Sequence, residues 1–486
     1  MIGPGNQLPL RESVLFQAEG YFDGIPYRFV DDVAIEAMVQ GKIVRFNDFD
    51  GFLRCRPTPT RPRRTIALLV AHVIFCCISL YIVEQRYSYL GLLGNPDTRA
   101  LLAAVINSLP LIGLMGIFLF GRFSFGYCLS FYFFTVLLGY CWIVPSSIYG
   151  YDGRLATLSI VVSAVVFSVP AVFWRPDRPK FPEISPAHFE LWLKAILIVS
   201  AAVLLAGASY NFKLAKLSEI YRYRDQIEFP KLLGYAIGIT TGAFLPFAFT
   251  CFAFLKRWGY VALTVVLMFA AFPVTLAKLN LLAPVWLAFL LLLSRRAGAR
   301  DAIILSLLLP IMIGLLGFVF QRSGLASSDL IFGTINFRMI AVPSMAIDLY
   351  NDFFSRHLLT YFCQISLIKP FFSQCPYAEP LALVMAKSYD FGALNASLFA
   401  TEGIASVGPV GAPLVALACG CIVALANGAS AKLPSRFVLV SSGVVLPAFL
   451  NVPMTTMLLS NGAAILFLLW LLTPRSLPPW AGADLP

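Results

Sequence analysis

The sequence predicts an all-α polytopic membrane protein, with about twelve transmembrane helices and a long outer loop that contains short re-entrant or interfacial helices. Three observations predict this class: 59% of the 486 residues are apolar, only 13% are charged, and the apolar residues gather in long runs. A span needs ~20 mainly apolar residues, whereas a soluble domain carries roughly 25% charged residues. The composition therefore excludes a disordered chain and argues against a soluble enzyme.

The apolar runs set the expected spans in chain order. They lie at 66–83, 100–120, 125–145, 155–174, 191–209, 232–255, 260–276, 281–293, 302–320, 403–426, 437–450 and 457–472. The run 281–293 is short, so it is expected to be a half-span or part of a helical hairpin with the run before it. None of these runs contains Asp or Glu, which argues against ion-coupled transport through buried carboxylates.

Residues 1–65 are polar, carry no signal-peptide pattern and end in the basic stretch 56–64. Within them, the short stretches 25–30 and 42–46 have the composition of strands. Two interpretations stay open for this segment: a small cytoplasmic appendage, or a disordered tail.

Lys and Arg set the expected orientation, because short cytoplasmic loops are enriched in both. The basic loops 175–180, 256–257 and 295–296 are therefore placed inside, together with the N-terminal segment. An even number of spans then puts both termini in the cytoplasm. The formal charge of +11 is explained by this topology and by anionic lipid headgroups rather than by nucleic acid.

The expected organisation has six parts. They are a cytoplasmic N-terminal segment (1–65), N-terminal spans (66–209), an outer basic loop (210–231), central spans (232–320), a long periplasmic loop (321–402) and C-terminal spans (403–486). A loop as long as 321–402 is usually functional, and its short apolar stretches are typical of interfacial or re-entrant helices. Cys363 and Cys375 share this loop. They are expected either to pair or to act as small apolar residues.

Several motifs stand in a characteristic order along residues 215–425. They are Tyr221-Arg-Tyr-Arg224, Leu233-Gly-Tyr235, a helical hairpin with Lys278 in its turn, Phe337-Arg-Met-Ile-Ala-Val-Pro343, Tyr350-Asn-Asp-Phe-Phe354 and Asn395-Ala-Ser-Leu-Phe-Ala-Thr-Glu-Gly403. In this order they resemble the bacterial oligosaccharide repeat-unit polymerases, the Wzy-type O-antigen polymerases. That family is similar to other polyprenyl-dependent membrane glycosyltransferases of the GT-C class.

The resemblance implies a multi-pass enzyme of the bacterial inner membrane that works on the periplasmic face. A growing glycan would leave its undecaprenyl diphosphate and be transferred to the sugar end of a new undecaprenyl-diphosphate-linked oligosaccharide. The product would be an O-antigen, a capsule or an exopolysaccharide. A flippase and a chain-length regulator are the protein partners that this implies. No cofactor and no metal are expected, because Arg side chains can supply the positive charge that the leaving diphosphate needs.

The expected diphosphate clamp consists of Arg222, Arg224 and Arg338, with Lys278 as a further cation, because guanidinium groups grip phosphate oxygens in pairs. The alternative for the first two is pairing with nearby acids of their own loop. For Arg338 the alternative is a salt bridge that orients the loop, with Asp348 or Asp352.

The expected base is Glu402, chosen ahead of Asp352, because a carboxylate can take the proton of the attacking hydroxyl. The alternative for Glu402 is an acid favoured at a helix N-terminus. Sugar contacts are assigned to Tyr221, Tyr235, Tyr350 and Asn395. These tyrosines could equally be aromatic residues of the membrane interface.

Rival functions from other classes stay open. A lipid-linked oligosaccharide flippase or other transporter predicts two related halves and polar groups along a central cavity. A non-catalytic membrane subunit of a polysaccharide assembly complex predicts that outer Arg residues are dispensable. The ligase that moves finished glycan to lipid A differs from a polymerase only in the motifs.

Overall fold

The computed structural model describes residues 20–474, apart from the gaps 23–24, 31–33, 40–41, 47–51, 53–61, 177–183, 215–222, 224–226, 323–327, 366–367, 373 and 393. The described chain is mainly helical, and ten of its helices are long and apolar enough to cross a membrane. This confirms the predicted class of all-α polytopic membrane protein. The number of candidate spans is lower than the twelve that the apolar runs suggest, for two reasons given below.

The first half of the described chain forms α2 (Pro62–Tyr87), α3 (Thr98–Leu114), α4 (Gly116–Phe120), α5 (Phe125–Ile143), α6 (Gly153–Phe173), α7 (Pro186–Tyr210), α9 (Lys231–Ile239), a π-helical turn η4 (Thr240–Phe244), α10 (Leu245–Phe254) and α11 (Trp258–Thr275). The second half forms α12 (Lys278–Arg322), α13 (Ser328–Phe332), a π-helical segment η5 (Gly333–Ala341), α14 (Val342–Arg356), α15 (Leu381–Tyr389), a π-helical turn η7 (Phe399–Ile404), α16 (Ala405–Ser430), α17 (Ser435–Ser441), α18 (Val445–Ala448), α19 (Met454–Leu459) and α20 (Ala463–Leu472).

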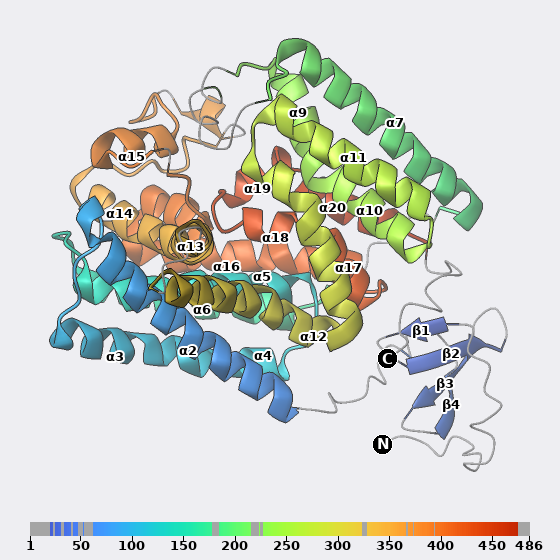
Figure 1. Ribbon diagram of the computed structural model, residues 1–486, viewed down its shortest axis with the longest axis horizontal. Helices are drawn as coiled ribbons and strands as arrows, with labels where there is room; N and C mark the ends of the chain where they lie inside the picture. The colour runs from blue at the N-terminus through green and yellow to red at the C-terminus, as the bar shows by residue number, and fades with distance from the viewer. Residues whose placement is uncertain are drawn as a thin grey trace.

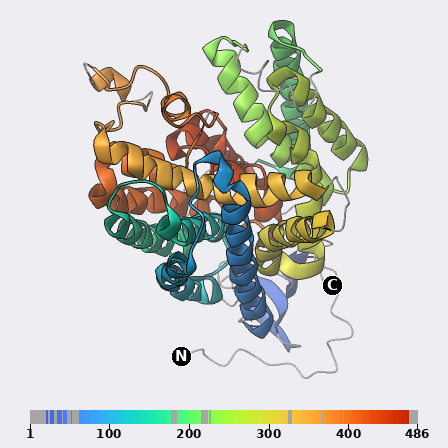
Figure 2. The ribbon, with the colours of Figure 1, turned by 60° about the vertical axis from the view of Figure 1, so that its left-hand side comes forward.

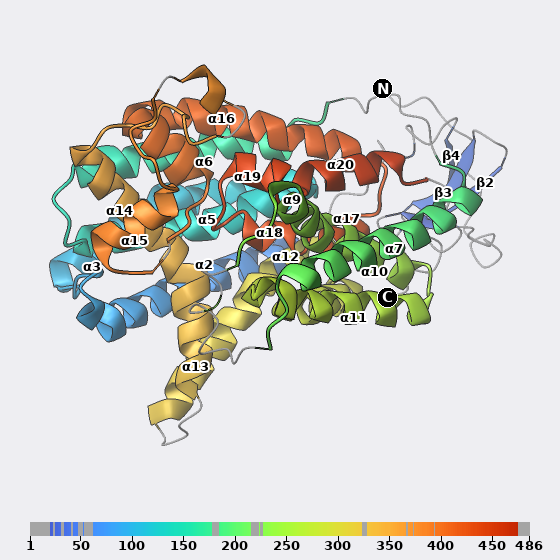
Figure 3. The same cartoon turned by 90° about the horizontal axis from the view of Figure 1, so that it is seen from above.

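Helix α5 forms the centre of the bundle. All of its residues are buried, and it packs against α2, α3, α6, α14 and α16. Figures 1 and 3 show α5, α6 and α16 running side by side. A helix that is apolar on every side can be covered by protein or by lipid. Here neighbouring helices cover it, so its aromatic side chains contact other rings rather than acyl chains, as Phe133 does in edge-to-face contacts with Phe167 and Phe399.

Helix α12 has two arms that meet at Gly298, where φ is +72°. Glycine adopts this left-handed backbone without the steric cost that a Cβ would bring. Figure 1 shows the two arms meeting at a corner. The first arm begins at Lys278, shortly after α11 ends, and it packs against α11. The run 281–293 is therefore not a half-span but part of a helical hairpin with the run before it, which was the other alternative.

Residues Leu330–Arg356 form a continuous apolar helix, made of the end of α13, η5 and α14. Figure 2 shows this orange helix running across the blue helix α2 rather than beside it. The expected long loop 321–402 is therefore wrong in its first part, and the irregular segment begins only after Arg356. Hydropathy hides this helix because it carries Asp348 and Asp352, which find hydrogen-bond partners inside the bundle.

The expected spans 437–450 and 457–472 are also wrong. In the structure they are four short helices, α17 to α20, each of ten residues or fewer. Proline and glycine cause the breaks: Pro453 precedes α19, and Gly462, with φ +80°, precedes α20. Helices this short cannot cross a hydrocarbon core of about 30 Å.

The N-terminal segment contains a four-stranded antiparallel sheet in the order β1 (Gly20–Phe22), β2 (Ile25–Phe29), β3 (Ile35–Val39) and β4 (Lys42–Phe46). A small core of Tyr27, Ile35, Ala37 and Phe52 lies against it. The folded appendage is therefore the correct one of the two interpretations of this segment.

Candidate functional site

A cavity of about 1210 Å³ lies among the helices of the second half of the chain. Its walls come from α9 and η4, the turn between α11 and α12, both arms of α12, η5, and the segment from α18 to α20. All three π-helical segments of the described chain contribute lining residues: Thr241 from η4, Met339 from η5 and Thr401 from η7. π-Helical turns are rare and occur frequently at functional sites, so this concentration marks the cavity as a candidate site.

Three of the expected site residues line this cavity: Lys278, Tyr350 and Asn395. They are far apart in sequence and come from α12, from α14 and from the segment before η7. Lys278 is the first residue of α12, directly after the turn in which Leu276 adopts a left-handed backbone. The structure therefore brings together one cation, one phenol and one amide from the expected set.

The polar lining also includes side chains that sequence reasoning missed, namely Asn280, Gln364, Thr401, Asn451, Thr456 and Asn461. These groups are amides and hydroxyls, which both donate and accept hydrogen bonds. For Asn451, Thr456 and Asn461 the available signal was their clustering at helix breaks, beside Pro453 and Gly462. Among the lining residues, only Lys278 carries a full charge.

Another part of the lining is apolar. Leu282 and Val285 on the first arm of α12 are 54% and 61% exposed, and Ile313 on the second arm is 53% exposed. Both arms belong to a candidate membrane helix. The lining is thus mixed: exposed polar side chains such as Asn395 and Thr456 share it with apolar side chains of α12.

Glu402 is not a lining residue of the cavity, but its chain neighbour Thr401 and Thr456 of α19 are. Its side chain is buried, and Oε1 accepts hydrogen bonds from the backbone N–H and the hydroxyl of Thr455, at 3.0 and 3.1 Å. The first N–H groups of a helix lack partners within it, so this carboxylate caps α19. Oε2 has no hydrogen-bond partner among the described residues.

Two further expected substrate-binding residues that the structure describes, Arg338 and Tyr235, do not line the cavity. Arg338 is exposed, although Ile335 and Met339 of the same segment are lining residues. Tyr235 is likewise 39% exposed and outside the lining. Tyr221, Arg222 and Arg224 lie outside the described residues; Phe229, soon after them in sequence, lines the cavity.

Asp352 has a different setting from Glu402. It is buried, pairs with Arg356 and accepts a hydrogen bond of 2.7 Å from the hydroxyl of Tyr389. One turn earlier, Asp348 accepts hydrogen bonds from Ser147 and Tyr151. Like Glu402, neither acid is a lining residue.

The pKa values of the phenols around these acids are raised by burial. Burial raises the pKa of the Tyr389 phenol, and the hydrogen bond to Asp352 raises that pKa further. Burial also raises the pKa of the Tyr151 phenol, and the charge of Asp348 raises it further. Both phenols therefore stay protonated as donors, which makes this cluster a set of anchors for α14.

Acids are also present inside candidate membrane helices. Glu84, Asp348, Asp352 and Glu402 are all buried within them. The expectation that spans lack carboxylates is therefore wrong, because the helices extend beyond the apolar runs and include the residues at their ends. Each of these acids accepts at least one hydrogen bond from a neighbouring segment.

Cys363 and Cys375 form a disulfide, whereas the other described cysteines are free. This resolves the two alternatives for this pair in favour of a bond. No group of three His, Cys, Asp or Glu side chains gathers in the described part of the chain in a way that could hold a metal ion.

Comparison with protein-family models, with curated proteins and with solved structures finds no match to this chain.

Proposed function

We propose that this membrane protein is a glycosyltransferase that polymerises undecaprenyl-diphosphate-linked oligosaccharide repeat units into a surface polysaccharide. The observation that carries the proposal is the mixed lining of the cavity, in which Lys278, amides and hydroxyls share the wall with apolar side chains of α12, a candidate membrane helix. A lipid-linked oligosaccharide has the same two kinds of surface. Its polyprenyl chain matches the apolar part of the lining, and its sugars match the hydrogen-bonding groups.

The chemistry needs a cation and a base. The acceptor hydroxyl attacks the anomeric carbon of the donor sugar, a new carbon–oxygen bond forms, and the bond to the diphosphate breaks. The diphosphate leaves with the electron pair, and Lys278 stabilises its charge, assisted by Arg222 and Arg224. Glu402 is the proposed acceptor of the proton of the hydroxyl. Its Oε1 is held by Thr455, and its Oε2 is buried without a partner among the described residues, so this step needs the side chain to turn toward the neighbouring cavity.

The disulfide supports the assignment of the side of the membrane. Disulfides persist in oxidising compartments, such as the bacterial periplasm, and are rare in the cytosol. Cys363 and Cys375 lie in the irregular segment after α14, next to residues that line the cavity. We place this segment in the periplasm of a bacterial inner membrane and the basic loops in the cytoplasm.

The test is transfer by the purified protein in nanodiscs, with lipid-linked glycan extracted from a strain that lacks the gene. We expect products longer by whole repeat units, together with free undecaprenyl diphosphate, both detected by mass spectrometry. A flippase would move the same substrate across a vesicle membrane without extending it. That outcome would overturn the proposal.

Lys278→Ala is expected to lower kcat/KM for the lipid-linked substrate about tenfold, because one charge-assisted contact to the leaving diphosphate contributes roughly 1.4 kcal/mol. Lys278→Arg keeps the charge and should retain most of the activity. The matched control is Lys387→Ala, which removes an exposed pair with Glu379. Equal kcat/KM values for the Lys278→Ala variant and the wild type would remove Lys278 from the site.

A further inference from the structure

The segment between α14 and η7 covers part of the cavity. Gln364 and the three residues Pro380, Leu381 and Ala382, at the start of α15, are lining residues. The segment reaches the cavity at two places, before and after the disulfide. Its position therefore shapes the space that a substrate would occupy.

A break in α16 holds the first part of this segment. Pro409 has no N–H, so the carbonyl of Ala405 loses its helical donor, and Gly408 leaves the helix with φ +73°. The backbone N–H of Thr360 donates to that carbonyl at 2.8 Å, and the N–H of Tyr361 donates to Ser406 O at 3.1 Å. The covering segment thus supplies the hydrogen bonds that the proline removes.

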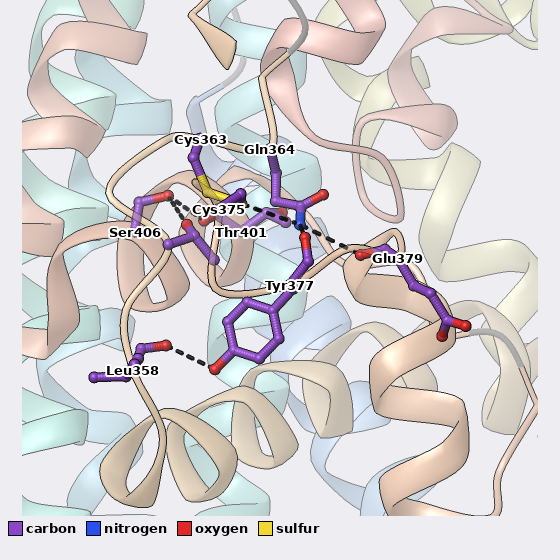
Figure 4. The surroundings of a disulfide bond; sticks show 9 residues. Leu358, Cys363, Gln364, Cys375, Tyr377, Glu379, Thr401 and Ser406 are labelled. Carbon is purple, nitrogen blue, oxygen red and sulfur yellow. Dashed lines mark hydrogen bonds between the residues drawn. A yellow bond between two sulfur atoms is a disulfide. The ribbon is translucent and has the colours of Figure 1, made fainter. Parts of the chain in front are cut away.

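The docking point is close to Glu402. The Ser406 hydroxyl contacts the Thr360 hydroxyl at 3.0 Å and donates to the carbonyl of Thr401, also at 3.0 Å. Figure 4 shows Thr401 and Ser406 beside the disulfide. Thr401 lines the cavity and directly precedes Glu402. The covering segment is therefore fixed to the part of the wall that carries the proposed base.

The disulfide fixes the second part of the segment. It joins Cys363, next to Gln364, to Cys375, which shortly precedes Tyr377. The Gln364 amide nitrogen donates to the carbonyl of Tyr377 at 2.9 Å and lies 3.3 Å from that of Glu379. Figure 4 shows the amide oxygen directed away from these carbonyls. Among the described residues, the amide nitrogen of Gln364 is thus engaged by the protein and its amide oxygen accepts no hydrogen bond.

We propose that Gln364 is a substrate-binding residue of the cavity, whose amide oxygen accepts a hydroxyl of the bound sugar, and that the Cys363–Cys375 disulfide sets its position. This inference rests on the proposed function, because it assigns Gln364 to the same substrate. Sugars are recognised through hydroxyl donors, and a carboxamide held on one side by backbone carbonyls is a directed acceptor for them.

The test compares full-length variants in nanodiscs with the extracted lipid-linked glycan. Gln364→Ala is expected to raise KM about fivefold to tenfold with little change in kcat, since one neutral hydrogen bond to substrate is lost. The double variant Cys363→Ser with Cys375→Ser should raise KM in the same direction. Lys387→Ala, on the same segment but in an exposed ion pair, serves as the control and should match the wild type.

Hydrogen exchange of the same samples separates position from folding. The double cysteine variant, or wild type with a reductant, should lose protection within residues 357–382 while α5 and α16 keep theirs. Unchanged KM for both Gln364→Ala and the double variant, in a protein that extends glycan normally, would overturn this inference alone. A wild type that neither binds nor extends the glycan would overturn the proposed function and this inference with it.

Discussion

Glu402→Gln is expected to lower the rate of glycan transfer by a factor of roughly 10² to 10⁴, the usual contribution of a general base. The substitution keeps one oxygen, which can still accept the two hydrogen bonds from Thr455. The other position becomes an amide that cannot take a proton. Because size and capping are preserved, the protein level should stay normal, and surface glycan should appear on gels as single repeat units instead of a ladder.

Two further variants separate the chemical role of Glu402 from its capping role. Thr455→Val removes the hydroxyl donor but keeps the backbone N–H bond to Oε1. If the hydrogen bonds between Thr455 and Glu402 only stabilise the fold, this variant should retain most of the glycan-transfer activity. Glu402→Ala removes both the proposed proton acceptor and the cap of α19. It should therefore also reduce the amount of folded protein. A normal ladder from Glu402→Gln would show that the carboxylate serves only as a cap.

Asn427→Ala is expected to lower the free energy of unfolding by about 2 kcal/mol, because it removes the side-chain partner of two buried backbone groups and of a third that is part-buried. The Asn427 side chain is 1% exposed. Its oxygen accepts from the N–H of Gly126 at 2.9 Å, and its nitrogen donates to the carbonyls of Ala171 and Trp174 at 2.7 and 3.2 Å. These groups are at the start of α5 and the end of α6, where helices lack internal partners. One side chain of α16 thus ties three helices together.

Thermal unfolding of the purified protein, followed by tryptophan fluorescence, measures this effect. Ser430→Ala is the control, because Ser430 is buried in the same helix but its hydroxyl donates within α16, to Ala426 O at 2.9 Å. It should change stability far less. If both variants unfold at the wild-type temperature, the three hydrogen bonds contribute nothing measurable to the fold.

The same physics explains why the cavity is built from broken helices. Proline and glycine interrupt α16 and the segment from α17 to α20, and each interruption frees backbone groups inside the bundle. In lipid such groups must find partners within the protein. Thr360 supplies one at Ala405 and Glu402 supplies another at Thr455. The residues that satisfy the breaks are therefore next to the cavity that the breaks create.

Several features of this protein follow from sequence alone. Apolar runs of about 20 residues can be stable only in a bilayer or in a large core, so the class and most of the long helices were predictable. Lys278, Tyr350 and Asn395 were identified from short motifs and do line one cavity. Their roles in binding substrate stay predictions.

The tertiary structure alone decided which apolar surface meets protein and which meets lipid. A hydropathy average cannot separate α5, which is wholly buried, from α3, of which only a minor part is buried. Both helices are apolar, because the protein interior and the lipid are both apolar surroundings. It also missed the helix Leu330–Arg356, whose acids are compensated by partners such as Ser147, far away in the chain. Arg338, in contrast, belongs to an expected motif but is exposed outside the lining. Whether a polar residue lies in a cavity, in a cap or at the surface depends on contacts between distant segments, and only folding establishes them.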